Sequence, residues 1–257
     1  MLCFLGMNTD TQIIILAAGK GKRMNSDIPK ALTPLGDKTM LEYVVNTATQ
    51  FNHKKPIVVI GYKGNEIKEQ LGDICNYVVQ DEQKGTGHAV MVAEQLLREN
   101  NSDTVIILFA DMPYISEDTL HKLTQARYEK DAKIVIATSE IEDESLFQNQ
   151  FYNFGRIIRD KDGIIKKIVE KKDAQDEELN VREINPAFFC LDKEWMLNRL
   201  RKIKNDNAQE EYYLTDLVKM AFDEGYTIES VQINEKEALG ANTPEQLALL
   251  ETYLHHA

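Results

Sequence analysis

The sequence predicts an α/β fold in which a mostly parallel sheet is covered by helices on both faces. Short β-branched runs recur along the chain, and segments with helical spacing of apolar residues separate them. Such runs are typical of buried strands. Their alternation with helices predicts parallel pairing, because each crossover helix must pack back onto the sheet. After about residue 140, a hairpin with an Asp-Gly turn predicts an added antiparallel part, so that the sheet is mixed.

Each element follows from its own local pattern. Strands are expected at 13–16, 57–60, 77–79, 105–109 and 134–137, with helices between them at 38–51, 64–71, 86–99 and 116–130. Ser116 and Asp118, after Pro113, form a typical helix start. Later elements are hairpin strands at 155–158 and 164–169, a strand near 226–233, and helices near 193–204, 214–224 and 243–254. The charged stretch 171–178 predicts a solvated loop.

Composition excludes several classes of protein. The chain has 257 residues, 43% hydrophobic and 28% charged, which is typical of a folded globular protein. A net charge of −12 argues against nucleic acid as the main partner, because phosphate backbones require a basic face. Cys3, Cys75 and Cys190 are too few and too far apart for a disulfide framework, and no apolar run is long enough to export or anchor the chain. We therefore expect a cytoplasmic protein that does not bind membranes.

A glycine-rich loop, Leu16–Met24, directly follows the first expected strand. Ligands of open α/β sheets bind at the carboxyl ends of strands, and glycines let a backbone approach an anion closely. Lysines and an arginine in the loop would compensate phosphate charge. No Gly-Lys-Ser/Thr ends the loop, and Met24 stands where a dinucleotide fingerprint has its third glycine, so neither common motif applies. The loop is thus either a phosphate cradle or an ordinary strand-to-helix turn.

The sequence beyond the loop favours the first alternative. With the continuation Asp27-Ile28-Pro29-Lys30-Ala31-Leu32, the segment 16–32 resembles the signature segment of the sugar nucleotidyltransferases. Further matches follow in order at Gln80 with 83–89, then at 111–113, 155–157, 168–174, 183–185, 207–209 with 212–216, and 240–242. This ordered set resembles the uridyltransferase domain of the bacterial N-acetylglucosamine-1-phosphate uridyltransferases. The resemblance implies a Rossmann-like fold of the nucleotide-diphospho-sugar transferase type.

The resemblance also implies an activity and a set of site residues. The expected reaction joins UTP and N-acetylglucosamine 1-phosphate to give UDP-N-acetylglucosamine and pyrophosphate, with Arg23 and Lys30 on the phosphates and Mg²⁺ held by Asp111 and Asn242. The nucleotide-binding set is Leu16, Ala17, Ala18, Gly19, Gly21, Gln80, Gly85 and Thr86, and the sugar-binding set is Gly155, Glu170, Asn185, Tyr213 and Thr215. A single domain over 10–257 is expected, with its nucleotide-binding part at about 10–140 and its sugar-binding part at about 141–257.

Each of these residues also has a local interpretation. Asp111 is equally typical of a cap before Pro113, and Asn242 and Thr243 are ordinary helix N-caps. Arg23 and Lys30 are plausible surface residues. The corresponding interpretations are a helix cap for Thr86, a solvated charged face for Glu170 and a core position for Tyr213. His88 lies within a helical pattern and no second histidine is spaced to form a metal site, so a structural role is expected.

Departures from the family pattern concentrate near the expected sugar end. The chain has Lys22 for Thr or Ser, Phe109-Ala110 for Tyr-Gly, Pro186-Ala187 for Thr-Gly, and Glu210 for Gly. The reaction type is therefore better determined than the sugar, and glucose 1-phosphate, CTP or a non-catalytic nucleotide-sugar-binding regulator remain alternatives. No hexapeptide repeat is present, so we expect no acetyltransferase β-helix domain. A homo-oligomer and a separate acetyltransferase are possible partners.

Overall fold

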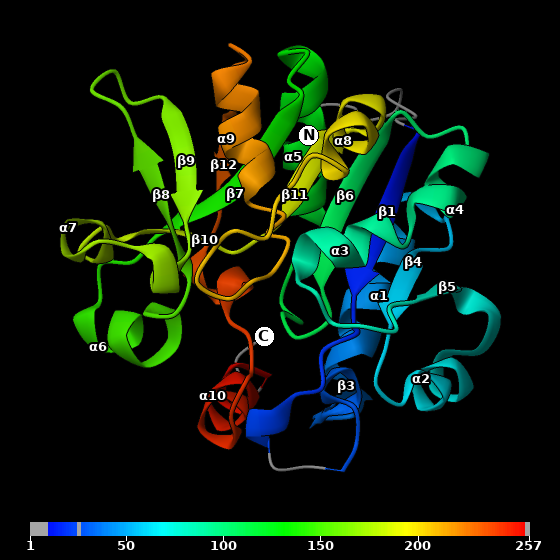
Figure 1. Ribbon diagram of the computed structural model, residues 1–257. Helices are drawn as coiled ribbons and strands as arrows, with labels where there is room; N and C mark the ends of the chain where they lie inside the picture. Colours follow the sequence, from blue (N-terminus) through cyan, green and yellow to red (C-terminus); the bar gives the residue numbers. More distant parts are fainter. Residues whose placement is uncertain (1–9, 25–26, 255–257) are drawn as a thin grey trace, which may run out of the picture.

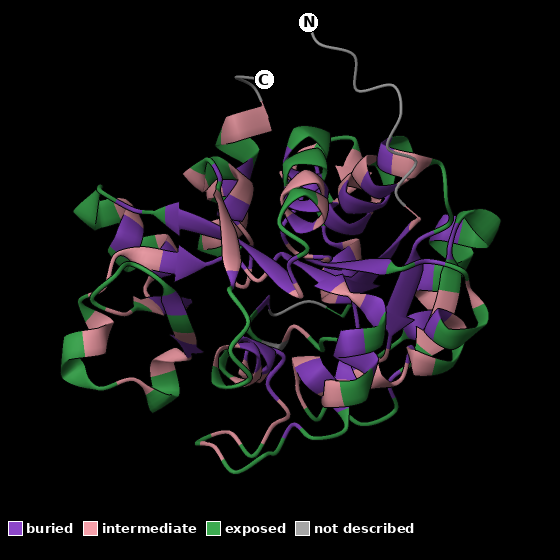
Figure 2. Cartoon of the chain, turned by 90° about the horizontal axis from the view of Figure 1, so that it is seen from above, coloured by how far each residue is buried: buried purple, intermediate pink, exposed green. Residues whose placement is uncertain are grey.

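The structure is a computed structural model, and it describes residues 10–24 and 27–254. Within these residues, ten strands form one mixed sheet with helices on both faces (Figures 1 and 2). The expected α/β fold with a mostly parallel, helix-covered sheet is confirmed. Cys3 and the apolar residues 1–6 lie outside the described residues, as do residues 255–257 of the expected domain.

The strand order across the sheet is β5-β4-β1-β6-β11-β7-β10-β8-β9, and β12 pairs with β7. The first four strands in this order are parallel: β5 (Asn76–Val79), β4 (Ile57–Ile60), β1 (Thr11–Leu16) and β6 (Thr104–Phe109). The others are β7 (Ile134–Glu140), β8 (Gly155–Arg159), β9 (Ile165–Val169), β10 (Glu183–Asn185), β11 (Phe189–Asp192) and β12 (Glu229–Gln232). The parallel strands therefore bring their carboxyl ends to one edge of the sheet.

The helices cover the two faces in separate groups. They are α1 (Met40–Asn52), α2 (Gly64–Leu71), α3 (Thr86–Met91), α4 (Glu94–Glu99), α5 (Glu117–Glu129), α6 (Glu144–Leu146), α7 (Asp176–Leu179), α8 (Lys193–Leu200), α9 (Asp216–Asp223) and α10 (Pro244–Leu254). Helices α1 and α5 pack on one face, whereas α3, α8 and α9 pack on the other. Strand β1 shows why both faces are buried: Ile13 and Ile15 contact the first group, and Ile14 and Leu16 contact the second. A continuous apolar run is what a strand buried on both faces requires.

Local capping chemistry sets several helix boundaries. Thr39 and Glu42 form a reciprocal capping box at the start of α1, and the Ser116 side chain accepts a hydrogen bond from the Thr119 N–H at the start of α5, as predicted from the sequence. The single helix expected at 86–99 is wrong. At Val92 and Ala93 the hydrogen bonding tightens, with the Ala93 N–H donating to the Val90 carbonyl, and this turn divides the segment into α3 and α4.

Two other sequence expectations need correction. The stretch 171–178 is not only a solvated loop: it contains a short 3-10 turn (Lys171–Asp173) and the start of α7. Its Asp173 side chain accepts hydrogen bonds from the Ala208 N–H and the Tyr213 hydroxyl, so the stretch is tied to the segment before α9. Strands β10 and β11 have no counterpart among the expected elements. The same is true of the small hairpin of β2 (Pro34–Leu35) and β3 (Lys38–Thr39).

Two further expectations concern cysteines and membranes. Among the described residues, Cys75 and Cys190 are both buried and free. Among the residues that the structure describes, no helix has the length and apolar character needed to cross a bilayer.

Candidate active site

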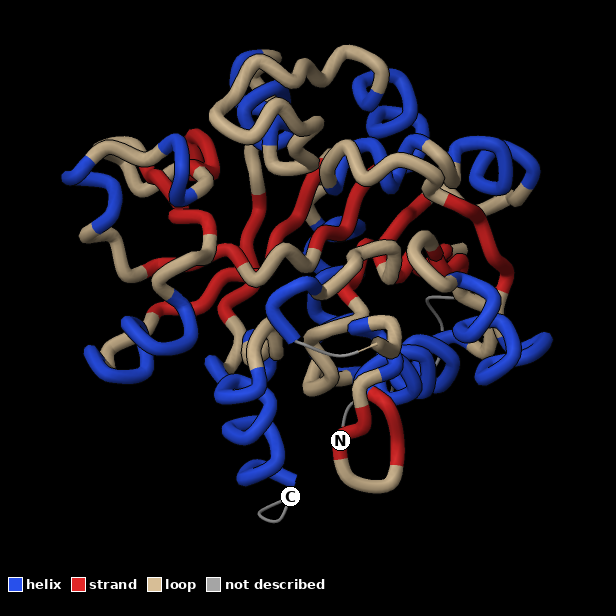
Figure 3. Tube along the Cα trace, turned by 60° about the horizontal axis from the view of Figure 1, so that its bottom comes forward, coloured by secondary structure: helices blue, strands red, loops and turns tan. Residues whose placement is uncertain are grey.

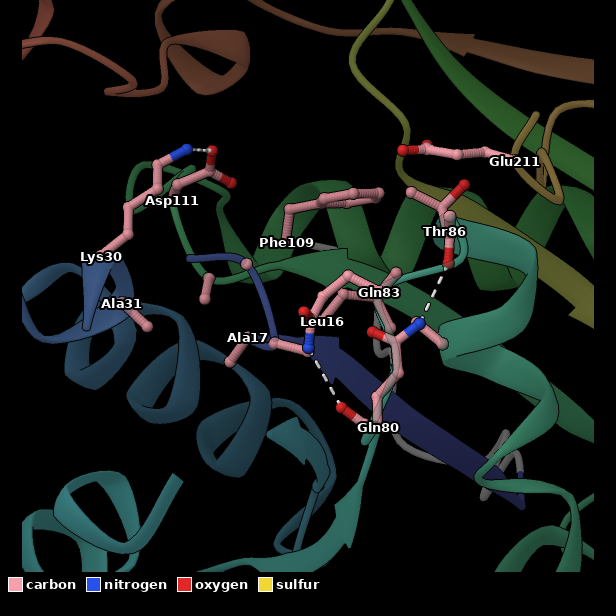
Figure 4. A pocket seen from close by; sticks show the side chains of 15 residues that line it. Leu16, Ala17, Lys30, Ala31, Gln80, Gln83, Thr86, Phe109, Asp111 and Glu211 are labelled. Carbon is pink, nitrogen blue, oxygen red and sulfur yellow. Dashed lines mark hydrogen bonds and ion pairs between the residues drawn. The ribbon is translucent and has the colours of Figure 1, made fainter. Parts of the chain in front are cut away.

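Two adjoining cavities lie at the carboxyl edge of the parallel strands, and Figure 3 turns this edge toward the viewer. The first cavity, of about 250 Å³, is bounded by the end of β1, the glycine-rich loop, the segment after β5 and the end of β6. Lys30 and Asp111 lie at one end of it, and Gln80 and Thr86 lie at the other (Figure 4). The glycine-rich loop thus stands where strand-end ligands bind.

The second cavity, of about 240 Å³, lies between the strands of the antiparallel part and α10. Thr86, Phe109 and Asp111 line both cavities, so the two meet at the end of β6. Two separate compartments that share one carboxylate can hold two ligands with their reactive ends in contact.

A cluster of charged and amide groups stands at this junction. The Lys30 ammonium Nζ makes an ion pair with Asp111 Oδ2 and donates to Asn242 Oδ1 at 2.6 Å. Arg23 Nη2 donates to the same Asn242 oxygen at 3.1 Å. Lys30 and Asp111 are largely shielded, with side-chain exposures of 12% and 18%. Lys30 is therefore not a surface residue, although Arg23 is exposed.

Gly21 explains how the loop holds Lys30. Its φ is +59°, in the left-handed region that glycine adopts without a Cβ penalty. A Cβ on Gly21 would lie 2.6 Å from the Cβ of Lys30. Gly21 is not among the residues that line either cavity, and its Cα stands against the Lys30 side chain. Gly19, in contrast, lines the first cavity and has open space around it.

The local interpretations of Asp111 and Asn242 as helix caps are not supported. Thr243 caps α10, because its hydroxyl accepts a hydrogen bond from the Gln246 N–H. The Asn242 side chain is left to accept from the two cations, and only its oxygen can do so because an amide NH₂ is not an acceptor. Ser116, and not Asp111, caps the next helix after β6.

Gln80 is buried at the far end of the first cavity, with 3% of its surface exposed. Its Nε2 donates to the Gly85 carbonyl at 3.2 Å and contacts His88 Nδ1 at 3.0 Å. Because the carbonyl can only accept, the amide orientation is fixed and His88 Nδ1 must be the acceptor, which places the histidine proton on Nε2. Both Gln80 donors are then used within the protein, and its Oε1 remains as the acceptor.

Gly85 and Thr86 join this wall to the segment before α9. Gly85 has a φ of +99°, and a Cβ there would lie 2.6 Å from the Tyr212 carbonyl oxygen. The Thr86 hydroxyl accepts a hydrogen bond from the Leu214 N–H at 3.1 Å. Helix α3 has no side-chain cap bond, so the capping interpretation of Thr86 is wrong. The hydroxyl instead fixes the boundary between the two cavities.

Polar side chains of the second cavity come from three different elements. Glu170 follows β9, Asn185 ends β10 and Thr215 precedes α9, and all three line the cavity together with Gly155. The Thr215 hydroxyl donates to Glu170 Oε1 at 3.2 Å, and burial raises the pKa of the Glu170 carboxyl. Glu170 is thus not on a solvated face. The arrangement offers both donors and acceptors to a polar ligand.

Two expected site residues do not line either cavity. Tyr213 is 8% exposed, and its hydroxyl donates to Asp173 and accepts from Gln209, which agrees with a core position. Gly21 is the other. Leu16, Ala17 and Ala18 do line the first cavity.

Sequence reasoning missed several residues that line the cavities. In the first they are Ala31, Gln83, Ala89 and Glu211, and in the second they are Met112, Gln150, Asn153, Phe154, Phe189, Leu214 and Gln246. Gln83 lies within a matching segment and Glu211 directly before one, so their position was a usable signal. Gln150 and Asn153 lie in a segment without a recognised motif and could not be found from the sequence.

Two of the departures from the family pattern, Ala187 and Glu210, fall at backbone positions with positive φ. Ala187 and Glu210 have φ values of +64° and +55°, in the region that favours glycine. The Asn185 side chain holds Ala187 there by accepting its N–H at 2.9 Å. These two positions thus keep a glycine-type backbone without glycine, whereas Phe109 lines both cavities.

Comparisons with known proteins show the family to which the chain belongs. The family model described as MobA-like NTP transferase domain matches residues 13–215. Curated relatives named bifunctional protein GlmU include one from Thermoanaerobacter pseudethanolicus, 42% identical over 234 residues (91% of this chain and 49% of that protein). Another, from Bacillus subtilis, is 37% identical over 242 residues, which are 94% of this chain and 51% of that protein. The chain spans about half the length of the curated relatives it matches.

Two solved structures share the fold. A putative glucose-1-phosphate thymidylyltransferase from Bacillus anthracis, in complex with a sucrose, has a TM-score of 0.75 at 17% identity, covering 96% of each chain. A UDP-glucose pyrophosphorylase complexed with UDP-glucose has a TM-score of 0.73 at 18% identity, covering 96% of this chain and 98% of the other. The expected nucleotide-diphospho-sugar transferase type of fold is confirmed by these neighbours.

Proposed function

The chain belongs to the MobA-like NTP transferase family, and on that premise we propose that it transfers a uridylyl group from UTP to N-acetylglucosamine 1-phosphate. The products are UDP-N-acetylglucosamine and pyrophosphate. The similarity to the GlmU proteins supports the choice of reaction. We assign the nucleotide to the part of the domain at about 10–140 and the sugar phosphate to the part at about 141–257.

The observation that carries the proposal is the pair of cavities that meet at Asp111. Nucleotidyl transfer requires an attacking oxygen, the α-phosphorus and the leaving group in line. A triphosphate in the first cavity and a sugar phosphate in the second would bring these atoms together beside Lys30 and Arg23.

The residues at the junction suit this chemistry without a protein nucleophile. An oxygen of the sugar phosphate, already ionised, forms the new bond to the α-phosphorus, and the bond from that phosphorus to the bridging oxygen of pyrophosphate breaks. Lys30 is a compact positive charge near the reacting phosphate, while Arg23 can contact two phosphate oxygens at once. Fixed cations of this kind stabilise the charge that accumulates in the transition state.

Asp111 and Asn242 fit a divalent cation. Asp111 Oδ2 and Asn242 Oδ1 converge on a single cationic atom, Lys30 Nζ, and a carboxylate with an amide oxygen is a donor set that Mg²⁺ accepts. When bound there, Mg²⁺ would neutralise phosphate charge and polarise phosphate oxygens. These two residues are the ones that we assign to hold it.

The polar groups of the two cavities support the assignment of uracil as the base and of N-acetylglucosamine as the sugar. The remaining Gln80 Oε1 is an acceptor that matches the N3–H of uracil, whereas cytosine has an acceptor at that position. Glu170, Asn185 and Thr215 can bind sugar hydroxyls and an acetamido group. Pro186 has no N–H to offer, so the protein must recognise the sugar through other groups than a backbone donor at this residue.

A pyrophosphate-release assay tests the proposal. UTP, CTP, dTTP and ATP would each be paired with N-acetylglucosamine 1-phosphate and glucose 1-phosphate, and the UTP and N-acetylglucosamine 1-phosphate pair should give the highest kcat/KM. A preference above about tenfold for another pair, about 1.4 kcal/mol, would replace our substrate assignment. Binding of nucleotide without pyrophosphate release would instead indicate a regulator.

Substitution at the junction tests the site itself. Asp111→Asn should lower turnover by on the order of 100-fold at limiting Mg²⁺, because it removes the anionic ligand. Asp162→Asn in the exposed turn of the β8–β9 hairpin is the matched control and should leave turnover unchanged. Full activity of Asp111→Asn would remove Asp111 from the site.

A further inference from the structure

We propose that Lys30 is a built-in counter-ion that occupies the metal-binding pair in the free protein and leaves it when Mg²⁺ binds. The exchange would release Lys30, and with it Arg23, to bind substrate phosphates. This inference rests on the proposed function, since it concerns the same site. It adds a coupling between metal binding and phosphate binding.

The contacts of one ammonium group carry the inference. Lys30 Nζ bonds to the Asp111 carboxylate and to the Asn242 amide oxygen, which are the two oxygens assigned to the metal. Arg23 donates to that amide oxygen as well, so both cations assigned to the phosphates are bound to metal ligands instead. With 12% of its side chain exposed, Lys30 has little water around it as an alternative partner.

The two arrangements exclude each other. Mg²⁺ binds through the same oxygen lone pairs that accept hydrogen bonds from Lys30, and its double charge would repel an ammonium at hydrogen-bond distance. Lys30 must therefore move away when the metal is bound. A phosphate oxygen is the natural new partner, because it offers the negative charge that Lys30 gives up on leaving Asp111.

The exchange makes binding of metal and of phosphate mutually favourable. A ligand that attracts Lys30 and Arg23 frees the oxygens of Asp111 and Asn242, and by linkage the metal must strengthen binding of that ligand by the same factor. The free protein should then bind the metal weakly. A site without Lys30 should bind the metal better although it turns over less.

Titration with Mn²⁺, followed by the electron paramagnetic resonance signal of the free ion, tests this without substrates and without activity. Lys30→Met should bind Mn²⁺ at least about tenfold more tightly than the wild-type protein, because the competing charge is gone. Lys30→Gln is a second neutral variant in case the first does not fold. Lys20→Met removes the same charge from an exposed residue of the same loop and should change the affinity by less than about threefold.

Three results would overturn the inference. One is equal or weaker Mn²⁺ binding by both neutral Lys30 variants, and the second is an equal gain in Lys20→Met, which would indicate a general charge effect. The third is tight binding that persists when Asp111→Asn is added to Lys30→Met, because the ion would then lie elsewhere. Pyrophosphate release by the wild-type protein is measured separately, so a failure of the proposed function is distinguished from a failure of the exchange.

Discussion

Replacing Gly21 by alanine should disturb Lys30 specifically, and the structure provides the magnitude. The φ of +59° costs a residue with a Cβ about 1 kcal/mol. The new Cβ would also lie 2.6 Å from the Lys30 Cβ, and this overlap adds about 1–3 kcal/mol. A total near 2–4 kcal/mol should lower Tm by about 5–15 °C. Since a misplacement of about 1 Å can cost 100-fold in rate, turnover should fall by on the order of 100-fold.

Variants of two other glycines separate the backbone cost of a positive φ from the steric overlap with Lys30. Gly225, after α9, has a φ of +82° and no neighbour that a Cβ would meet within 4 Å, so Gly225→Ala should show the backbone cost alone. Gly19 has open space and lines the first cavity, so Gly19→Ala should keep Tm and raise the KM for UTP. Thermal unfolding and pyrophosphate release are measured on all three variants. Normal turnover in Gly21→Ala, with a Tm loss no larger than that of Gly225→Ala, would refute the reasoning.

Three further predictions test other parts of the site. His88→Leu should lower the ratio of kcat/KM for UTP to that for CTP by about three- to tenfold, because the Gln80 amide loses an acceptor that orients it. The control variant His88→Asn should retain the ratio. An unchanged ratio in His88→Leu would show that the Gly85 carbonyl alone orients the amide. Ala187→Gly should raise Tm by about 1–3 °C, because glycine adopts the positive φ without a Cβ penalty. The gain is small because glycine also makes the unfolded chain more flexible. A lower Tm would mean that the alanine is not strained. Burial, with nearby carboxylates adding to the effect, raises the pKa of Asp216 to about 6, so the folded protein binds a proton that the unfolded chain has released. The contribution of Asp216 to the free energy of unfolding is therefore complete below about pH 4 and is lost as pH rises through 6. In Asp216→Asn, the free energy of unfolding in urea should change less between pH 4 and pH 6 than in the wild-type protein, by on the order of 1–2 kcal/mol.

The parallel half of the fold could be predicted from the sequence because its signals are local. The run 105–109, for example, is apolar throughout and begins with three β-branched residues, a pattern typical of a strand that is buried on both faces. Strand β11 lacked such a signal: four residues shortly after Pro186 insert between β6 and β7, and only pairing with two distant strands makes them a strand. Long-range pairing of this kind is not encoded in a short window of sequence.

The candidate site divides in the same way. The sequence by itself determined which residue types stand at the strand ends, because the glycine-rich loop, Gln80 and Asp111 each follow an apolar run. Only the tertiary structure decided their partners: Asn242 meets Arg23 across 219 residues of sequence, and the Tyr213 hydroxyl donates to Asp173. The physical reason is that a side chain's chemistry belongs to its residue type, whereas its hydrogen-bond partners and its charge neighbours are set by how distant segments pack against one another.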